Sequence, residues 1–384
     1  MSLRARLQRI LLVLAVATSG TVTTALPAEA EATALCRLLD VQVPADVTDH
    51  QVMIVPGTAA RTWTIHGELC LPSGATASTV LLALHGITYK HDYWDPGYQP
   101  ERYSFARAMA AAGYATYAPD RLGYGDSSHP ASALVSLDSD VAVTHSLIGS
   151  LRTGGVGGTG FRRVVLVGNS YGSAISWRES ELHNDADAVV ATGYASVLQN
   201  DAILQLLGAL RPAAADPAFA GRGLDPGYLT PRPGQRETGF IYYPDNADPA
   251  MVAYDEARMR DTVTVGEGSI FLHLGAYPLG PFDIPNVPQT ENINIPSFLL
   301  NGSHDTLTCG PQLTHCTSDR VLQNAENRYF SASACFRAGV VPASGHVLNL
   351  HRNAAVAFAK IRAWLDQAVG PDGSRLPAYR ARCK

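Results

Sequence analysis

A serine, an aspartate and a histidine occur in this chain in an order that could support nucleophilic catalysis. Ser170 lies between two glycines in the stretch "GNSYG", from Gly168 to Gly172. Asp305 and His346 follow it, each just after an apolar stretch. A serine hydroxyl becomes a nucleophile when a histidine accepts its proton and a carboxylate orients that histidine. These residue types in this order therefore predict an acyl-transfer site.

The segments around Ser170 explain why two glycines flank it. The run "VVLV" before Gly168 predicts a buried strand, and "AISWRESELH" after Gly172 predicts a helix. A serine at such a bend projects from the carboxyl edge of the sheet, where the helix N-terminus favours negative charge. Glycines and a serine also form ordinary turns, so the rest of the chain must show whether Ser170 is a nucleophile.

Strand-like and helix-like segments alternate along most of the chain. This rhythm predicts an α/β fold with a mostly parallel central sheet and helices on both faces. The expected strands cover 61–72, 78–88, 115–120, 162–168, 185–195, 297–305 and 336–346, and the expected helices cover 103–114, 135–151, 174–183 and 349–369.

The rhythm breaks between residues 197 and 295, where we expect a partly helical cap. The cap would be inserted into one large core that comprises 31–196 and 296–384. Its helix-like segment 200–211 and its aromatic stretch could cover a pocket above Ser170 and favour a partly apolar substrate, or could simply form the cap's own core. The residues in question are Ile203, Leu206, Leu207, Leu210, Phe240, Ile241, Tyr242 and Tyr243.

Several motifs in this order resemble the α/β-hydrolase family. An apolar strand ends in His85 and Gly86 in "LLALHGIT", and the loop "DRLGYGDS" starts at Asp120 after the next strand. The Gly-x-Ser-x-Gly turn comes next. Asp305 and His346 then follow the strands after which that family carries its acid and its base.

The resemblance implies roles for residues around the serine. The backbone N–H groups of Ile87 and Tyr171 would form an oxyanion hole. Asp120 would shape the site without doing chemistry, and His85 is expected to be a buried, hydrogen-bonded structural histidine. Chemistry of this kind requires no cofactor.

The identity of the acid is the open point of this site. Asp305 and His346 are farther apart in the sequence than is usual in the family, because a cysteine-bearing segment lies between them. Asp201 follows the preceding strand, where some members of the family carry the acid. Asp305 is the expected acid, and Asp201 is the alternative.

The resemblance predicts a serine hydrolase that cleaves an ester, a lactone or a similar acyl bond. A serine at position 170 argues against dehalogenase or epoxide-hydrolase chemistry, for which the family uses aspartate. Two alternatives stay open: a secreted aminopeptidase of the same fold, and a non-catalytic binding protein that kept the scaffold. The cap carboxylates that could hold the amino terminus of a peptide are Glu237, Asp245, Asp255 and Glu256.

The N-terminus predicts a cleaved signal peptide over 1–30. Three arginines in the first nine residues precede the apolar run Ile10–Ala17, and Ala28-Glu29-Ala30 offers a cleavage site. The run is shorter than the roughly 20 residues that a membrane span needs, and no later segment is apolar enough. We therefore expect an exported protein without a stable membrane anchor.

The composition and the net charge indicate which classes of partner this protein can bind. A hydrophobic share of 46% in 384 residues predicts a sizeable core, and a net charge of −5 argues against nucleic acid as a partner. The expected partner is a small acyl compound. Arginine greatly outnumbers lysine, which favours a bacterial source with GC-rich DNA.

Six cysteines, all beyond the expected cleavage site, predict disulfides. They allow fifteen pairings, and position in the expected fold favours three: Cys36 with Cys70, Cys309 with Cys316, and Cys335 with Cys383. No Cys-x-x-Cys or His-Glu-x-x-His motif is present in the sequence, so no metal site is expected.

Three further features could be taken for functional sites, but each has a simpler structural interpretation. The glycine-rich stretch Gly154–Gly160 lacks the Lys-Ser/Thr of a phosphate loop and is expected to be a plain connection. Asn301 starts a glycosylation sequon but ends an expected core strand. His351 lies within the expected last helix, packed or solvated.

Overall fold

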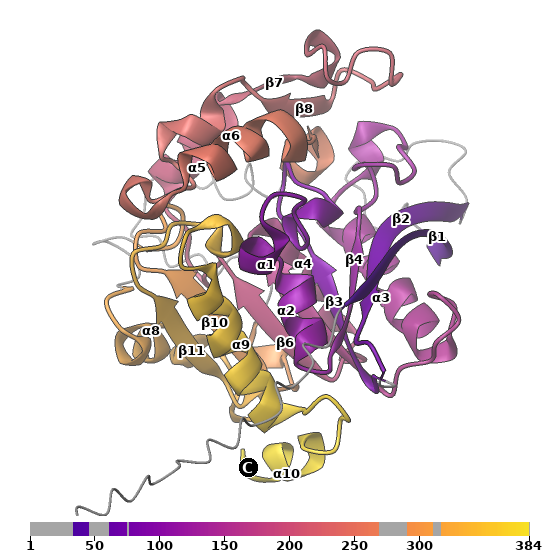
Figure 1. The fold of residues 1–384 in the computed structure, drawn as a ribbon, viewed down its shortest axis with the longest axis vertical. Coiled ribbons are helices and arrows are strands. Elements are labelled where there is room, and N and C mark those ends of the chain that lie inside the picture. The colour runs from indigo at the N-terminus through magenta and orange to yellow at the C-terminus, as the bar shows by residue number, and fades with distance from the viewer. Residues whose placement is uncertain (1–33, 46–60, 75–76, 269–289, 310–315, 384) are drawn as a thin grey trace, which may run out of the picture. The chain divides into compact units, whose positions relative to one another are not determined.

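The computed structural model describes residues 34–45, 61–74, 77–268, 290–309 and 316–383 (Figure 1). The expected signal peptide lies outside these residues. Among the described residues, no helix combines the length and the apolar character that crossing a membrane requires.

An eight-stranded sheet runs through the core in the order β1-β2-β4-β3-β5-β6-β10-β11. Strand β2 is antiparallel to its neighbours β1 and β4, and the other pairs are parallel. The strands are β1 Leu35–Ala45, β2 Arg61–Leu71, β3 Thr79–Leu84, β4 Ala115–Pro119, β5 Arg163–Asn169, β6 Ala188–Thr192, β10 Ser297–Gly302 and β11 Arg337–Val341. The mostly parallel sheet expected from the sequence is confirmed.

Helices cover both faces of this sheet (Figure 1). The central strands are buried along their length, as parallel strands covered on both sides must be. Helices α3 and α4 pack on one face, and α2 and α9 pack on the other. The core helices are α1 Pro100–Tyr103, α2 Phe105–Ala111, α3 Leu137–Thr153, α4 Tyr171–Leu182, α8 Asp319–Glu326, α9 Ala354–Ala368 and α10 Leu376–Ala381.

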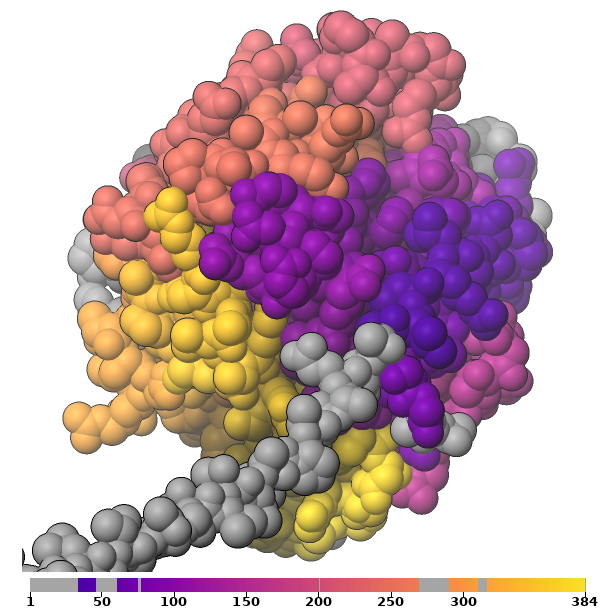
Figure 2. All heavy atoms as spheres, in the orientation of Figure 1, coloured from indigo at the N-terminus to yellow at the C-terminus, as the bar shows by residue number. Residues whose placement is uncertain are grey.

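The described part of the expected cap includes helices α5 and α6 and a separate three-stranded antiparallel sheet. In Figure 2 its atoms form a continuous surface with the core on the side shown. Its elements are α5 Asn200–Gly208, β7 Leu210–Pro212, β8 Tyr228–Pro231, α6 Pro249–Tyr254 and β9 Val263–Thr264.

Several expected helices differ from the structure at their ends, and two of these differences concern the cap and His351. The cap helix ends at Gly208, because Leu210–Pro212 pairs with β8. The last helix starts only at Ala354, so His351 lies before it and not within it. There His351 forms an isolated β-bridge with Ala247 of the cap.

Candidate active site

Ser170 lies at a strained bend between β5 and α4. Its backbone has φ 54° and ψ −120°, a conformation that costs a non-glycine residue about 1 to 3 kcal/mol. A Cβ on Gly168 would collide with the backbone of Gly172 and Ser173, and a Cβ on Gly172 would collide with the carbonyl of Leu84. Both glycines are therefore required for the bend that carries Ser170.

His346 and Asp305 are hydrogen-bonded to each other. The Nδ1 atom of His346 lies 2.9 Å from Oδ2 of Asp305, and both residues are buried. A carboxylate only accepts, so Nδ1 carries the proton and Nε2 is left as an acceptor. The other oxygen of Asp305 accepts the backbone N–H of Leu307 at 2.9 Å, which fixes the carboxylate behind the imidazole.

Asp201, the alternative acid, lies elsewhere. It is exposed in the first turn of α5, whereas Asp305 contacts the histidine. Asp305 and His346 are 41 positions apart, and the segment between them accommodates the Cys309–Cys316 disulfide and α8 without separating the two side chains.

Ser170 and His346 line one cavity whose walls are mostly apolar. The cap helix α5 contributes Ile203 and Leu206 to these walls. The residues that line the cavity are Ser170, Tyr171, Ala174, Gly193, Tyr194, Leu198, Ile203, Leu206, Leu307 and His346.

The other expected cap residues do not line this cavity. Leu207 and Phe240 pack beside it against Ile203 and Leu307, and Leu210 packs against the core from β7. Ile241 and Tyr242 are buried in the core. The ring of Tyr243 stacks on His304 with centroids 3.8 Å apart. The helix pattern therefore predicted the lining better than the aromatic stretch did.

His85 and Gly86 directly follow β3, and Gly86 lies close to the serine. A Cβ on Gly86 would lie 3.0 Å from the Cβ of Ser170, so a larger residue would crowd the bend. His85 donates from Nδ1 to the Gly86 carbonyl at 2.8 Å and accepts the Arg121 N–H at Nε2 at 3.0 Å. Burial, together with Arg121, holds the pKa of His85 well below its ordinary value. The expectation of a buried, hydrogen-bonded His85 is confirmed.

Asp120 organises the loop that follows β4. Its Oδ1 accepts the backbone N–H of His91 at 2.8 Å and the ring Nδ1 at 2.7 Å, and its Oδ2 accepts the N–H of Asp126 at 2.9 Å. Burial alone would raise the pKa of Asp120, but the hydrogen bonds from His91 and Asp126 hold it below its ordinary value.

Arg121 is a buried charge near the site that sequence reasoning missed. Its guanidinium pairs with Asp140 at 2.8 Å and Glu267 at 2.7 Å, and it also donates to the His85 carbonyl at 3.1 Å. It lies 5.1 Å from the centre of the Tyr171 ring. Arg121 thus contacts both segments that carry the expected oxyanion N–H groups. Arg121 belongs to the motif "DRLGYGDS". Its partner Glu267 lies 146 residues away, and no sequence pattern around Glu267 indicates that the two residues pair.

The four cap carboxylates lie outside the set of cavity-lining residues. Asp255 is buried and accepts the hydroxyls of Tyr89 and Tyr242, each at 2.7 Å. Glu256 accepts backbone N–H groups, Asp245 accepts the Tyr243 hydroxyl, and Glu237 is exposed.

Three disulfides join the six cysteines in the pairing that their positions favour. Cys36 and Cys70 lie opposite each other on β1 and β2. Cys309 pairs with Cys316, and Cys335 pairs with Cys383.

Two of the remaining features have plain structural explanations. Asn301 is buried, and its amide exchanges hydrogen bonds with the backbone of Tyr194. The stretch Gly154–Gly160 connects α3 to β5, beginning with Gly154 in the left-handed conformation at the end of the helix.

Comparisons with known proteins agree with this architecture. The model of the alpha/beta hydrolase family matches residues 80–359. Epoxide hydrolase A of Mycobacterium tuberculosis is 39% identical over 84 residues, which span 22% of this chain and only 24% of that relative.

Solved structures show the same fold. An alpha/beta hydrolase fold protein from Chitinophaga pinensis superposes with a TM-score of 0.51 at 14% identity, over 88% of this chain and 98% of that one. A soluble variant of monoglyceride lipase from Saccharomyces cerevisiae gives a TM-score of 0.53 at 14% identity, over 84% of this chain and 95% of that one. At such identities the likeness concerns the fold alone.

Proposed function

The chain belongs to the alpha/beta hydrolase family, and within it we propose a serine hydrolase that cleaves esters of partly apolar acids. The observation that carries this proposal is the 2.9 Å hydrogen bond between His346 and Asp305, in a cavity that Ser170 also lines. Ser170 is the nucleophile, His346 the general base and Asp305 the residue that orients the base.

The proposed reaction has two halves. The Ser170 hydroxyl attacks the ester carbonyl while Nε2 of His346 takes its proton, and the N–H groups of Ile87 and Tyr171 stabilise the oxyanion. Collapse expels the alcohol, which receives the proton from His346, and leaves an acyl group on Ser170. Water then enters the same sequence and releases the acid.

The cavity lining supports an acyl substrate over an aminoacyl one. Five of its side chains are Ala, Leu or Ile, and none of the described lining residues is a carboxylate that could hold a substrate ammonium group. A partly apolar acyl chain beside Ile203 and Leu206 would bury its surface there.

Epoxide hydrolysis is a chemistry that the name of the curated relative raises. The family's epoxide hydrolases attack with an aspartate, whereas this chain has Ser170 at the bend. We therefore propose ester cleavage for this chain.

Hydrolysis of chromogenic substrates tests the proposal. We expect p-nitrophenyl esters of short and medium chains to be cleaved, and Ser170→Ala to lose about 10⁶-fold in kcat, the scale known for loss of a triad serine. Aminoacyl p-nitroanilides serve as the comparison. Faster cleavage of these anilides than of the esters would indicate an aminopeptidase, and folded wild type without turnover of either class would indicate a binding protein.

We also propose that the protein is exported after cleavage of residues 1–30. Three disulfides support an oxidising compartment. N-terminal sequencing of protein recovered outside a bacterial host should give a chain that starts after Ala30. Recovery inside the cell with the segment intact would contradict export.

A further inference from the structure

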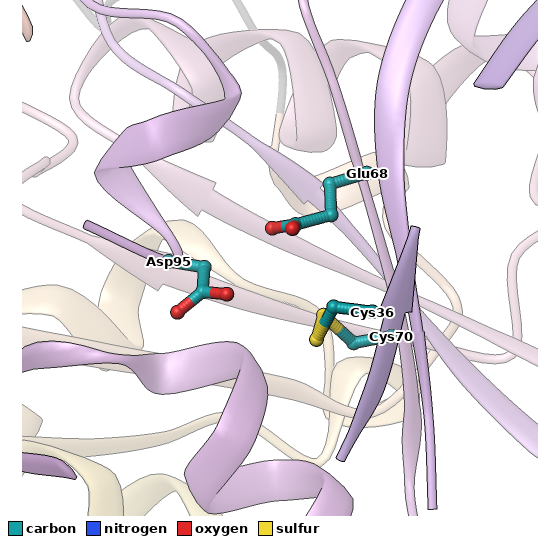
Figure 3. Close-up of side chains that lie close together, drawn as sticks. All are labelled: Cys36, Glu68, Cys70 and Asp95. Atoms are coloured by element: carbon teal, nitrogen blue, oxygen red, sulfur yellow. A yellow bond between two sulfur atoms is a disulfide. The ribbon is translucent and has the colours of Figure 1, made fainter. Parts of the chain in front are cut away.

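Three clusters of potential metal ligands occur among the described residues, and two of them are already satisfied. Figure 3 shows the first, which comprises Cys36, Glu68, Cys70 and Asp95. Its two sulfur atoms are bonded to each other, and Asp95 is paired with Arg107 at 2.9 Å. A disulfide offers no thiolate, so this cluster lacks its strongest ligands.

The second cluster, His66, His91 and Asp120, is also satisfied. His91 donates to Asp120 from its ring and from its backbone, and His66 pairs with Asp40 at 2.8 Å. The carboxylate and one nitrogen of each ring are therefore engaged in ordinary ion pairs.

The third cluster brings together His145, Glu179 and Asp185. His145 lies on α3, Glu179 lies near the end of α4, and Asp185 follows α4 before β6. The Nδ1 atom of His145 is 2.8 Å from Oδ2 of Asp185 and 3.9 Å from Oε1 of Glu179. One ligand atom from each of the three lies within 4.8 Å of the other two.

What distinguishes this cluster is a buried carboxylate without a hydrogen-bond donor. The Glu179 side chain is fully buried, and no N–H or hydroxyl group of the described residues donates to either of its oxygens. Oδ1 of Asp185 is in the same condition. Glu179 lies against a second carboxyl group, that of Asp185, and burial together with this neighbour raises the pKa of Glu179. Arg152 lies nearby, but its guanidinium donates to the Asp185 carbonyl and to Asp187. A buried carboxylate left in this way, as Glu179 is, is costly unless a cation or a proton compensates it.

We propose that His145, Glu179 and Asp185 bind a divalent transition-metal cation, with Zn²⁺ as the best match. Zinc accepts imidazole nitrogen together with carboxylate oxygen. Two ligand atoms that each lie about 2.1 Å from a tetrahedral zinc are about 3.4 Å apart. The observed separations of 2.8 and 3.9 Å bracket this value, so small side-chain rotations suffice.

The site is open on one side. The His145 side chain is 47% exposed, and that of Asp185 is 30% exposed. An ion can therefore enter from solvent, and a water molecule can complete the coordination.

The bound cation would join α3 to the end of α4. Glu179 lies nine residues beyond Ser170, which is about 13 Å along the helix axis. Such a distance makes the cation a structural clamp on the helix pair and not a part of the Ser170 chemistry.

Zinc binding by the full-length protein tests the proposal directly. After removal of metals with a chelator, wild type is titrated with Zn²⁺ by calorimetry, and its thermal unfolding is followed with and without the metal. We expect one equivalent to bind and to raise Tm, because a ligand that binds only the folded state stabilises it.

Three variants locate the site. His145→Gln changes a half-exposed side chain, and Glu179→Gln keeps the shape of the buried one. Each should weaken binding by about 100-fold or more, since loss of a mere outer-sphere partner already costs about 10- to 100-fold. His66→Gln, in the satisfied second cluster, is the matched control and should bind as wild type does.

Several results would overturn the proposal. They are the failure of wild type to bind one equivalent, unchanged binding in His145→Gln, and equal weakening in His66→Gln, which would indicate unspecific binding to surface histidines. If Glu179→Gln does not fold, the soluble His145→Gln variant still decides.

Discussion

Three buried histidines near the site differ in what their Nε2 atoms do. In His85 this atom accepts the N–H of Arg121, and in His351 it accepts the N–H groups of Tyr243 and Gly345. His346 instead lines the cavity and holds its other nitrogen against Asp305. Hydrogen bonds with the backbone therefore give His85 and His351 structural roles. The Asp305 carboxylate orients His346 so that its Nε2 can accept a proton.

Two substitutions separate the candidate acids. Asp305→Asn should lower kcat by about 10⁴-fold, the cost known for an amide that holds the histidine in the wrong tautomer. Asp201→Asn, on the exposed side of α5, should leave kcat unchanged. Ester hydrolysis by the two folded variants measures this, and the opposite ranking would assign the acid to Asp201.

His351 makes stability depend on pH. Burial lowers the pKa of His351 to about 4, against smaller opposing effects of the Val347 carbonyl and Asp305. The Nε2 atom of His351 accepts two backbone N–H groups. An unfolded histidine titrates near 6.5, so the stability from neutral His351 is complete above pH 6.5 and is lost as the pH falls toward 4. The loss should be about 3 kcal/mol.

Urea unfolding at pH 7 and pH 4 measures this contribution. His351→Gln should be less stable than wild type at pH 7 but should lose less on acidification. Equal acid losses in both proteins would show that His351 does not titrate as described.

Residue roles could be predicted from the sequence where the constraint is local. The bend at Ser170 needs its two glycines within five positions, so the pattern is visible in the letters. Arg121 and Glu267 could not be found together, because their ion pair joins residues 146 positions apart. The ligand cluster on α3 and α4 was missed for the same reason: its histidine and its first carboxylate lie on different helices.

Among the elements of the cap, α5 contributes two residues to the cavity wall. Ile203 and Leu206 line the cavity, and Leu204 on the other side of the helix is 64% exposed. Its apolar periodicity could be predicted, but its end could not. Leu210–Pro212 leaves the helix to pair with β8, which comes after a connection of 15 residues. Strand partners at such distance leave no trace in local periodicity.

A tryptophan on each side of α5 tests its role. Ile203→Trp should fill part of the cavity and lower kcat/KM for an octanoyl ester about tenfold or more relative to an acetyl ester. Leu204→Trp is the matched control and should leave the ratio of the two esters unchanged. Equal ratios in both variants and wild type would mean that α5 does not contact the acyl chain.

In the whole molecule, one disulfide connects distant parts of the chain and another closes a short loop. Cys335 and Cys383 are 48 residues apart. Their disulfide joins the segment just before β11 to the segment after α10. Cys309 and Cys316 close a short loop directly after Asp305, whose carbonyl accepts the Cys309 N–H at 2.9 Å. The Cys335–Cys383 disulfide should therefore stabilise the fold, and the Cys309–Cys316 disulfide should hold Asp305 in position.

Paired serine substitutions distinguish these effects. Cys335→Ser/Cys383→Ser should lower the free energy of unfolding by about 2 to 4 kcal/mol and leave kcat intact. Cys309→Ser/Cys316→Ser should lower kcat by up to about 100-fold, because small displacements of a catalytic group are expensive. If the second variant keeps full kcat and loses only thermal stability, the loop is a staple and does not position Asp305.

The nucleophilicity of Ser170 is the central claim, and covalent labelling tests it most directly. A fluorophosphonate adds its phosphonyl group to an activated serine oxygen and releases fluoride, so intact-protein mass spectrometry counts the labels and peptide mapping locates them. We predict one label on Ser170 in wild type, none in folded Ser170→Ala, and much slower labelling in His346→Ala. Folded wild type that remains unlabelled, or a label that persists in Ser170→Ala, would contradict the account.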